Sequence, residues 1–387
     1  MDILVAHNFY QQPGGEDQCV ATEVAMLRVH GHNVIQYCLH NDSIDAMHSL
    51  DAASRTIWSR PAFHELRQLF QTHRPQIAHF HNTFPLISPA GYYAARAEKI
   101  RVVQTLHNFR LLCGNALLFR DGEVCEDCIG KSIAWPGIVH KCYRGSLTAS
   151  SAVAVMLAVH RMMGTWRSAV DVYIAPTEFV RHKLIEGGLP ADKIAIKPNL
   201  NLDPGPGNGC GGYGLFVGRL SAEKGIDTLI EAWQNLGGSV PLKVVGDGPM
   251  AAVVQAAAET VPALQWLGRL QSEAIYPLMG EAAFLVLPSR CYETFGRVIL
   301  EAYAKGTPVV ASKLGAMAEL VDDGRTGLHF KPGDPADLAE KVRRLMANPL
   351  ELMRMRQAAR QEFTHKFNAG ANYQALMAIY ERAAGDL

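Results

Sequence analysis

The sequence predicts an α/β protein made of two doubly wound domains that face each other across a cleft. Its 387 residues are enough for two or three domains. Short β-rich runs alternate with longer helical patterns, which is typical of parallel sheets with crossover helices. Residues 199–212 are rich in glycine and proline and have no periodicity, so they indicate a linker between two such alternations. We therefore expect one domain at residues 1–200 and a second at 201–387.

The first domain is expected to contain six strands with helices between them. The strands are predicted at Ile3–Ala6, Val34–Tyr37, Ile77–Phe80, Val102–Leu106, Val172–Ala175 and Ile194–Ile196. Helical patterns are found at Cys19–Val29, Phe63–Gln71 and Tyr92–Lys99. A cysteine-rich insertion at residues 108–145 follows the fourth strand.

The second domain repeats this organisation. Its strands are predicted at Leu215–Val217, Leu242–Val245, Leu264–Leu267, Phe284–Leu287 and Val309–Ala311. Its helices are predicted at Ile226–Trp233, Met250–Glu259, Ser272–Met279, Phe295–Ala304 and Pro335–Met346. The tail, Leu350 to Ala384, has a helical composition.

Composition excludes several classes of protein. Lys and Arg number 37 and Asp and Glu number 37, so the chain lacks the basic surplus of a general nucleic-acid binder. With 48% hydrophobic residues it has ample material for buried cores. No basic region precedes an apolar one at the N-terminus, and the longest uncharged apolar stretch, Ser146 to Val159, is too short to span a bilayer. We expect a cytoplasmic protein, and residues 146–159 fit a core helix or a helix lying on the inner membrane surface.

The clearest functional segment runs from Gly214 to Asp227. A strand ends at Gly218, Arg219 and Lys224 follow in a loop, and a helix opens near Gly225. A helix start offers unpaired backbone N–H groups and the positive end of the helix dipole. An arginine fork and a lysine charge beside it suit a diphosphate. A solvated loop with two exposed cations is the simpler alternative.

The segment Val244 to Ala251 matches the Gly-x-Gly-x-x-Gly/Ala fingerprint of dinucleotide binding and follows a strand. The acidic residue that should end the next strand is missing, since Arg269 stands there. The motif also sits on the second strand of its domain instead of the first. These departures argue against a nicotinamide-dependent dehydrogenase.

The most informative segment runs from Phe284 to Glu301. A buried strand leads into a loop with Glu293, and a helix that starts around Phe295–Gly296 carries Glu301. Carboxylates accept hydrogen bonds from the vicinal hydroxyls of a ribose or hexose. Gly296 leaves its backbone N–H open to an oxyanion. The plainer alternatives are that Glu293 interacts with the helix dipole and that Glu301 pairs with Lys305.

These residues carry a resemblance to a known family. Gly218-Arg219, Lys224-Gly225, the run from Gly246 to Pro249, and the pair Glu293 and Glu301 occur in the order and spacing of group-1 glycosyltransferases, the large retaining family with the GT-B fold of two Rossmann-like domains. The residues Gly306 to Val310 that follow strengthen the match. The likeness covers nearly the whole chain and is strongest from Tyr213 to Phe330.

The resemblance implies a donor site in the second domain. Arg219 and Lys224 would clamp the diphosphate of a nucleotide-sugar donor, Glu293 would hold the hydroxyls of the donor sugar, and Glu301 would hold the ribose. Backbone at Phe295 and Gly296 would meet phosphate or sugar. The remaining implied donor-site residues are Asp247, Arg269 and Leu270, the last two bordering the base. In this family the last helix usually returns to the first domain.

The first domain should then bind the acceptor. Gly14 and Gly15 lie in the loop after the first strand, and in similar transferases this loop caps the diphosphate. His107 ends a strand, where a family histidine contacts the donor sugar and helps stabilise the transition state, although a purely structural histidine is the alternative. His81 ends another strand and is a weaker candidate for the acceptor pocket.

The chain departs from the family pattern at four cysteines, Cys113, Cys125, Cys128 and Cys142. The turn residues Arg120 to Gly122 predict a β-hairpin that presents the Cys-x-x-Cys pair. Four thiolates suit a tetrahedral structural zinc that would order an insertion without its own core. An iron–sulfur cluster fits less well, and reduced core thiols or a redox-sensitive pair remain as alternatives.

Together these features predict a retaining, hexosyltransferase-type enzyme. It would pass a sugar from a nucleotide-diphosphate sugar to a saccharide or lipid-linked saccharide, in polysaccharide or lipid-linked glycan biosynthesis. Arg219, Lys224 and helix N-termini would meet the charge of the leaving diphosphate. The sequence has no Asp-x-Asp pair to hold a metal, so no catalytic cofactor is expected. Two alternatives remain: a sugar-nucleotide epimerase or hydrolase on the same fold, and a non-catalytic nucleotide-sugar-binding scaffold. We also expect Glu293→Ala and Lys224→Ala to abolish transfer without unfolding the protein.

Overall fold

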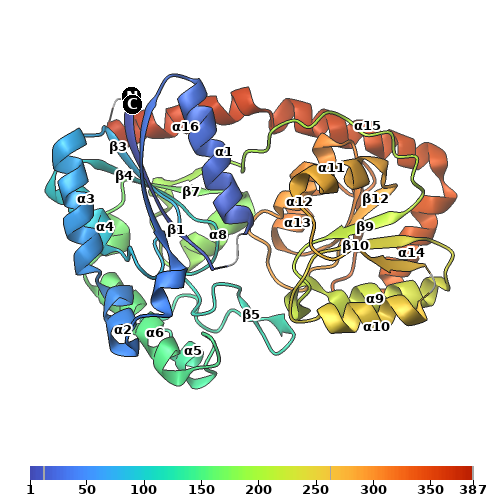
Figure 1. Cartoon of the computed structure of the whole chain (residues 1–387), viewed down its shortest axis with the longest axis horizontal. Coiled ribbons are helices and arrows are strands. Elements are labelled where there is room, and N and C mark those ends of the chain that lie inside the picture. Colours follow the sequence, from blue (N-terminus) through green and yellow to red (C-terminus); the bar gives the residue numbers. More distant parts are fainter. Residues whose placement is uncertain (12–13, 262, 386–387) are drawn as a thin grey trace. The chain divides into compact units, whose positions relative to one another are not determined.

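The computed structural model describes residues 1–11, 14–261 and 263–385 (Figure 1). The chain forms two compact units. Unit 1 comprises Met1–Leu118, Cys125–Leu200 and Ala369–Leu387, and unit 2 comprises Phe119–Val124 and Asn201–Asn368. Each unit has a six-stranded sheet whose strand pairs are parallel.

The sheet of unit 1 contains all six strands that the sequence predicts. They are β1 (Asp2–Phe9), β2 (Asn33–His40), β3 (Ile77–Phe80), β4 (Arg101–Thr105), β7 (Val172–Ala175) and β8 (Ile194–Ile196), in the order β2-β1-β3-β4-β7-β8. The three predicted helices are α1 (Gly15–Val29), α3 (Arg60–His73) and α4 (Ala90–Ala97). Further helices are η1 (Asn41–Ile44), α2 (Ser49–Ile57), α5 (Trp135–Val139), α6 (Leu147–Met162), α7 (Thr165–Ser168), α8 (Glu178–Glu186) and η2 (Ala191–Lys193).

The sheet of unit 2 has the order β11-β10-β9-β12-β13-β14. Its strands are β9 (Gly214–Val217), β10 (Leu242–Val245), β11 (Leu264–Trp266), β12 (Phe284–Leu287), β13 (Val309–Ser312) and β14 (Gly327–Phe330), of which the last was not anticipated. The helices are η3 (Ala222–Lys224), α9 (Ile226–Leu236), α10 (Ala251–Thr260), α11 (Ser272–Glu281), α12 (Arg297–Ala304), α13 (Gly315–Leu320), α14 (Pro335–Ala347) and α15 (Pro349–Lys366).

Both faces of the unit 2 sheet are covered, as its apolar strands require. Phe216 and Val244 point to one face, where they pack with α9, α10 and α14, while Leu215 and Val245 point to the other, where they pack with α11, α12, α13 and α15. Figure 1 shows helices on both sides of this sheet. The burial leaves only strand ends and loops to present polar side chains to a ligand.

The helical tail is divided between the two units. α15 places Phe363 in the core of unit 2, whereas α16 (Ala369–Ala384) belongs to unit 1. Leu376 and Tyr380 of α16 are fully buried and pack with Ile3 and Val5 of β1. The terminal helix therefore completes the core of unit 1, the unit to which the resemblance assigns it.

The cysteine-rich insertion contains the predicted hairpin. β5 (Phe119–Arg120) and β6 (Glu123–Val124) pair antiparallel, with Asp121 and Gly122 in the turn at positive φ. Residues 108–145 were expected to belong entirely to the first domain, but this hairpin groups with unit 2. Its strands are too short for a core of their own, so the hairpin depends on its surroundings.

The apolar stretch Ser146–Val159 forms most of α6. Val153, Met156 and Leu157 are buried, and His160 is bonded to the Ile57 carbonyl and the Thr165 hydroxyl. One face of α6 thus belongs to the core of unit 1, as the simpler alternative predicted. Among the described residues, none of the helices has the length and apolar character needed to cross a membrane.

Candidate active site

The strand order of unit 2 identifies one edge of its sheet as the place for a ligand. The order reverses between β9, the first strand of the unit, and β12, the fourth. Open α/β sheets bind ligands in the crevice beyond the carboxyl ends of the strands at such a switch point. The loop with Arg219 and Lys224 follows β9, and the loop with Glu293 follows β12. The two segments selected from the sequence therefore lie at the switch point.

Three glycines bring the loops at this edge together. Gly225 has a φ of 70°, and a Cβ added to it would stand 1.9 Å from the Pro288 carbonyl oxygen. The loop after β10 approaches in the same way, since a Cβ on Gly246 would stand 1.8 Å from the Gly218 oxygen and one on Gly248 would stand 2.5 Å from the Leu220 oxygen. The dinucleotide-like glycine spacing is thus explained by backbone packing between loops.

Lys224 and Glu293 form a direct ion pair. The Lys224 Nζ donates to Glu293 Oε1 at 2.6 Å, and the Ser289 hydroxyl donates to the same oxygen at 2.6 Å. The Lys224 side chain is 26% exposed and that of Glu293 13%, so the pair is only partly solvated. The structure therefore places a cation beside an acceptor carboxylate.

Both groups of this pair are charged at neutral pH. Burial alone would raise the pKa of Glu293, but the Lys224 charge and the hydrogen bonds from Lys224 and Ser289 hold it below its ordinary value. Burial likewise acts to lower the pKa of Lys224, but the Glu293 carboxylate outweighs it and raises the pKa. Glu293 can therefore accept hydrogen bonds from hydroxyl groups, and Lys224 can meet an anion.

The other predicted donor residues differ in their surroundings. Arg219, Asp247 and Arg269 are exposed at the carboxyl ends of β9, β10 and β11, and Leu270 is half-buried beside Arg269. Asp247 accepts the N–H of Gly248 at 2.7 Å through its side chain. These residues share the edge of the sheet with the Lys224–Glu293 pair.

Glu301 lies on α12 and pairs with a different residue from the one considered from the sequence. Arg297 Nε lies 3.2 Å from Glu301 Oε1, four residues earlier on the same helix. Burial raises the pKa of Glu301, and the Arg297 charge opposes that rise. Arg297 is therefore a site residue that the sequence reasoning missed.

The helix α12 begins two residues later than predicted. Gly296 is its N-cap at φ 67° and ψ 60°, a left-handed conformation that favours glycine, and Phe295 is buried against Ile299 and other core residues. The first N–H groups of α12 point toward the same edge of the sheet, because the helix follows β12.

Ser289 was also missed, and its hydroxyl directly after Pro288 gave no distinguishing signal in the sequence.

In unit 1 the strand order reverses between β1 and β3. Gly14 follows β1 as the N-cap of α1, where its N–H donates to the Asp17 carboxylate at 2.8 Å, and an added Cβ would meet open space. Gly15 is the exposed first residue of α1. Gly14 itself therefore leaves its backbone open to close approach.

His81 follows β3 and His107 follows β4 at the same edge. Their rings are parallel within 18°, and His81 Nδ1 lies 3.0 Å from His107 Nε2. Burial lowers the pKa of His81 to about 3 and that of His107 well below its ordinary value. Both histidines are therefore neutral at physiological pH, and His107 is joined to His81, which the sequence ranked lower.

A buried carboxyl group near these histidines was not selected from the sequence. Oxygen Oε1 of Glu16 on α1 is buried and lacks a hydrogen-bond partner within the described residues. Burial, followed by the charge of Asp17, raises the pKa of Glu16 to about 8. Tyr10, Asn108 and Arg110 act on the same carboxyl. Such a group is a candidate for contact with a polar ligand.

We expect Glu16→Gln to stabilise the protein at alkaline pH. The folded-state pKa of Glu16, about 8, lies above the unfolded value, so its contribution to stability is full below about pH 4.5 and is lost as the pH rises toward 8. The variant should therefore gain up to about 5 kcal/mol at pH 9, or about 10 °C in Tm, and about 1 kcal/mol or less at pH 5. Thermal melts of both proteins across this range measure the difference.

The control for this experiment is Glu259→Gln, which removes an exposed carboxylate on α10. Its melting temperature should follow that of the parent at every pH. A Glu16→Gln curve that also runs parallel to the parent would contradict the raised pKa.

The four cysteines of the insertion lie within one stretch of the chain, from residue 113 to residue 142. Cys113 and Cys128 are buried, and Cys125 and Cys142 are half-buried. Burial raises the pKa of Cys128 to about 11, and the other three cysteines add to the rise. Among the described residues, one set of three potential metal ligands has its ligand atoms within 4.8 Å of one another. That set is Glu23, His79 and His81, and it includes none of the four cysteines.

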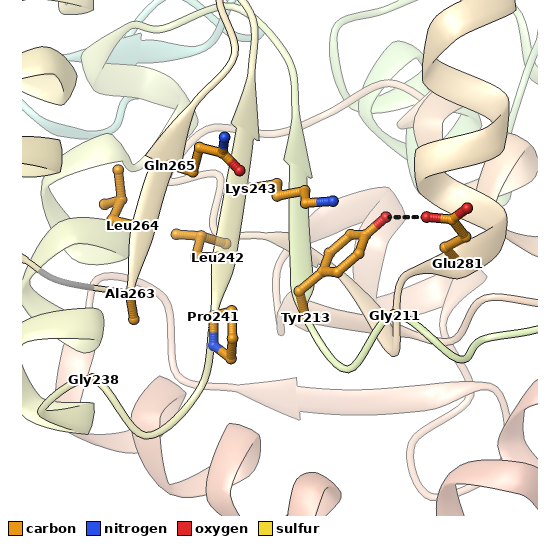
Figure 2. A pocket seen from close by; sticks show the side chains of 10 residues that line it. All are labelled: Gly211, Tyr213, Gly238, Pro241, Leu242, Lys243, Ala263, Leu264, Gln265 and Glu281. Carbon is orange, nitrogen blue, oxygen red and sulfur yellow. Dashed lines mark hydrogen bonds between the residues drawn. The ribbon is translucent and has the colours of Figure 1, made fainter.

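A hollow of about 710 Å³ lies at the opposite edge of the unit 2 sheet (Figure 2). Its lining includes Tyr213, Lys243 and Glu281, at the amino ends of β9 and β10 and the end of α11. The Lys243 ammonium stacks 3.8 Å from the Tyr213 ring centroid, and the Tyr213 hydroxyl donates to the Leu278 carbonyl. These groups already satisfy one another, so the candidate active site remains the carboxyl edge.

The fold and the site together define a protein of two doubly wound units with a lysine–glutamate ion pair at the switch point of the second sheet. Residues 212–348 match the family model for glycosyl transferases group 1, and residues 13–200 match that for glycosyltransferase family 4. The chain belongs to the group-1 glycosyltransferases, as the motifs predicted.

Two relatives illustrate the sequence similarity. A glycosyltransferase of Methanocaldococcus jannaschii, itself uncharacterised, is 30% identical over 213 residues, which cover 54% of this chain and 59% of the relative. Glycogen synthase of Mycobacterium tuberculosis is 39% identical over 160 residues, 40% of this chain and 38% of the relative. The matches thus span about two fifths to three fifths of the relatives' own lengths.

Solved structures share the fold over the whole chain. HepE of Anabaena in complex with UDP-glucose has a TM-score of 0.70 at 18% identity and covers 98% of this chain and 99% of its own. Sucrose-phosphate synthase of Thermosynechococcus elongatus has a TM-score of 0.70 at 18% identity and covers both chains completely. The chain therefore has the GT-B fold that the sequence predicted.

Proposed function

We propose that this protein is a retaining glycosyltransferase of the hexosyltransferase type. It moves a sugar from a nucleotide-diphosphate sugar to an acceptor hydroxyl, in polysaccharide or lipid-linked glycan biosynthesis. The observation that carries the proposal is the Lys224–Glu293 pair at the switch point of unit 2, with both groups charged. One member suits a diphosphate and the other suits sugar hydroxyls.

The charged residues of the candidate site and the start of α12 then have roles in donor binding. Lys224 and the exposed Arg219 meet the diphosphate, and the N–H groups at Phe295 and Gly296 add partial positive charge at the start of α12. Glu293 accepts from the donor sugar, and Glu301 accepts from the ribose. Because Arg297 pairs with Glu301, ribose binding must share or displace that contact.

In the proposed reaction, cations that are already in place stabilise the negative charge that develops on the leaving diphosphate. The bond between the anomeric carbon and the diphosphate oxygen breaks, and a bond to the acceptor oxygen forms on the same face of the sugar. The acceptor proton passes to the leaving phosphate oxygen, so no separate base is required. Lys224 and Arg219 stabilise the charge that develops on the diphosphate, as preorganised cations do in general.

A UDP-sugar is the first donor to test. HepE, which shares the fold, has been solved with UDP, with UDP and glucose, and with UDP-glucose. The acceptor is a saccharide, free or lipid-linked, and it binds unit 1 near His107. Four exposed apolar side chains on and just after α6 suit contact with the cytoplasmic face of a membrane: Leu147, Val155, Met162 and Met163.

A thermal-shift screen with UDP, GDP, ADP and TDP tests donor binding. A nucleotide present at a hundredfold excess over its Kd should stabilise the folded protein by about 2.7 kcal/mol. The shift should vanish in Lys224→Met, which loses the cation but keeps an apolar stem. If none of the four nucleotides shifts the melting temperature of the parent protein at millimolar concentration, the donor site is wrong.

Incubation with the donor that binds then separates the functions. Transfer of labelled sugar to a lipid extract or oligosaccharide, with the anomeric configuration kept, supports the proposal. Release of nucleotide without an acceptor indicates a hydrolase, and binding without any turnover indicates a scaffold. Either of the last two results overturns the transferase.

We also propose that Cys113, Cys125, Cys128 and Cys142 bind one structural zinc ion. Gly137 links two of them, since its carbonyl accepts the Cys142 N–H at 2.9 Å and an added Cβ would stand 3.7 Å from Cys128 Sγ. The insertion has little regular structure, and five non-glycine residues in it have positive φ: Ala116, Leu118, Asp121, Lys141 and Arg144. A closed zinc site supplies the order that such a segment lacks.

Zinc binding would tighten the cluster. Bonds of about 2.3 Å in a tetrahedron set the sulfur atoms about 3.8 Å apart. Among the residues that the structure describes, no three of the four sulfur atoms lie within 4.8 Å of one another, so the ion would have to draw them together. We expect one zinc per chain in elemental analysis of anaerobically purified protein.

Variants locate the metal. Cys128→Ser should lose the zinc, whereas Cys210→Ser, at an exposed cysteine outside the insertion, should keep it. Zinc below about a tenth of an atom per chain, or equal zinc in the two variants, overturns the proposal. Disulfides in the insertion, detected by alkylation and mass spectrometry, would overturn it as well.

A further inference from the structure

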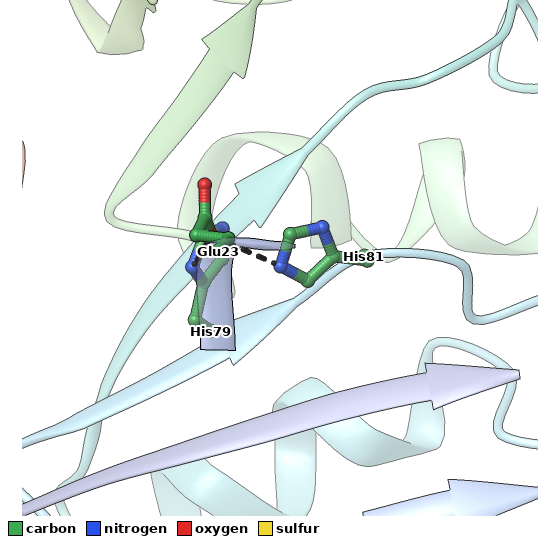
Figure 3. Close-up of side chains that lie close together, drawn as sticks. All are labelled: Glu23, His79 and His81. Atoms are coloured by element: carbon green, nitrogen blue, oxygen red, sulfur yellow. Dashed lines mark ion pairs between the residues drawn. The ribbon is translucent and has the colours of Figure 1, made fainter. Parts of the chain in front are cut away.

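A buried carboxylate, Glu23, lies against His79 and His81 in unit 1 (Figure 3). Glu23 projects from α1, and its Oε1 lies 3.3 Å from His81 Nε2 and 3.2 Å from His79 Nδ1. The side chains of Glu23, His79 and His81 are between 0 and 7% exposed. No motif in the sequence marks Glu23.

Glu23 is ionised in the folded protein. Burial by itself would raise its pKa, but Lys197 and the two histidines hold the pKa well below its ordinary value. Lys197 Nζ lies 3.0 Å from Glu23 Oε2 and also donates to the Asn372 side chain. A carboxylate in this state can only accept hydrogen bonds.

The cluster is a charge network and not a metal site. Lys197 already supplies the cation next to Glu23. Both ring nitrogens of His79 have partners, the Tyr380 hydroxyl at 2.8 Å and the Thr105 hydroxyl at 2.8 Å. A metal would have to displace these contacts and lie beside an ammonium group.

The position of the His81 proton follows from this network. His81 is neutral at pH 7, because burial and the neighbouring histidines lower its pKa to about 3, so it carries a single N–H. Among the described residues, His81 Nε2 has no partner besides Glu23 Oε1, which also lies close to His79 Nδ1. With the proton on Nδ1, a bare nitrogen would face a buried carboxylate at 3.3 Å, so the proton belongs on Nε2.

The same reasoning extends to His107. With its proton on Nε2, His81 offers a lone pair at Nδ1, which lies 3.0 Å from His107 Nε2. His107 is also neutral, because burial and the charge of His81 lower its pKa. Its one proton therefore belongs on Nε2, where it donates to His81, and Nδ1 carries none.

We propose that Glu23, held by Lys197, is a positioning residue that acts through His81 to fix His107 as the Nε2–H tautomer. In this tautomer His107 Nδ1 can accept a hydrogen bond but cannot donate one, which suits a sugar hydroxyl and does not suit a carboxylate or phosphate oxygen. The tautomer itself depends on unit 1 alone. Its role in recognising a hydroxyl rests on the proposed transferase function.

Nitrogen NMR of the histidines tests the tautomer without any assay of activity. In protein labelled with ¹⁵N-histidine, long-range proton correlations at pH 7 distinguish a protonated from a bare ring nitrogen. We expect His81 and His107 both to be protonated at Nε2 alone. A His107 protonated at Nδ1, or at both nitrogens, overturns the proposal in the wild-type protein, whether or not any variant folds.

Glu23→Gln tests the positioning role. The amide can donate or accept, so His107 should change from one tautomer to a mixture of the two, and kcat should fall about tenfold with KM for the donor within about twofold. Glu65→Gln is the matched control, because Glu65 accepts from Tyr37 in unit 1 and contacts neither histidine. An unchanged His107 tautomer in Glu23→Gln contradicts the role of Glu23. If no transferase activity were found, the kinetic comparison would be lost, but the NMR test of the tautomer would still apply.

Discussion

Replacing Glu293 by glutamine is expected to lower kcat/KM for glycosyl transfer by about a hundredfold or more while leaving the protein folded. The carboxylate is ionised because Lys224 and Ser289 hold its pKa below the ordinary value. Glutamine keeps an oxygen for Lys224 and Ser289 but loses the negative charge that strengthens hydrogen bonds from sugar hydroxyls. Nucleotide release from a donor in the presence of acceptor measures the loss.

The chain offers a closely matched control for this substitution. Glu223 lies in the loop after β9, and its Oε1 accepts from the Ser221 hydroxyl at 2.6 Å, as Glu293 Oε1 does from Ser289. Glu223→Gln removes a carboxylate with a similar hydroxyl contact but without the Lys224 partner at Oε1. Equal losses in the two variants would show that Glu293 has no special role.

Glutamine is a better test than alanine because of the ion pair. From the sequence, alanine at either Lys224 or Glu293 was expected to cost little stability, since both lie in loops. The structure joins them at 2.6 Å in a partly buried pair. Removing one partner leaves the other charge without compensation, which destabilises a folded protein. A loss of activity in the alanine variants would therefore mix chemistry with folding.

Gly225→Ala is expected to destabilise unit 2 by about 3 kcal/mol or more, which corresponds to about 10 °C in Tm. The φ of 70° disfavours any side chain, and the new Cβ would overlap the Pro288 carbonyl oxygen at 1.9 Å. The loops after β9 and β12 would have to separate. Because those loops carry Lys224 and Glu293, nucleotide affinity should fall together with stability in thermal melts and titrations.

Gly237→Ala separates the two causes of this effect. Gly237 stands at the other end of α9, also in the left-handed region at φ 60°, but an added Cβ there meets nothing within 4 Å. It should show only the cost of the backbone conformation, about 1 to 2 kcal/mol, with unchanged nucleotide binding. If both alanine variants lost the same stability, the close approach to Pro288 would be wrong.

The strands were predictable because burial on both faces makes them continuous apolar runs. Phe284–Leu287 and Val172–Ala175 were predicted with the bounds that the structure has. The ends of helices were harder to place, and α12 begins at Arg297 because Gly296 adopts a left-handed N-cap. The strand β14 was missed because Gly327–Phe330 is short and includes a histidine.

The motifs identified the residues of the candidate site but not their partners. Lys224 and Glu293 were selected separately, and their bond depends on a close approach of two loops that are 60 or more residues apart in the chain. Arg297, Ser289 and Glu16 have no sequence signal of their own. Each gained its interest from what lies beside it after folding.

The sequence by itself determined the class of this protein, because strand periodicity, glycine placement and charged residues at strand ends are local properties that can be read along the chain. Only the tertiary structure decided which charges meet, which carboxyls are buried and where histidine protons reside. Those properties depend on distances of about 3 Å between residues from different elements, and on the removal of water around them. Glu23, Lys197 and His107 illustrate the difference, since they come from α1, the end of β8 and the end of β4 and act on one another only when folded.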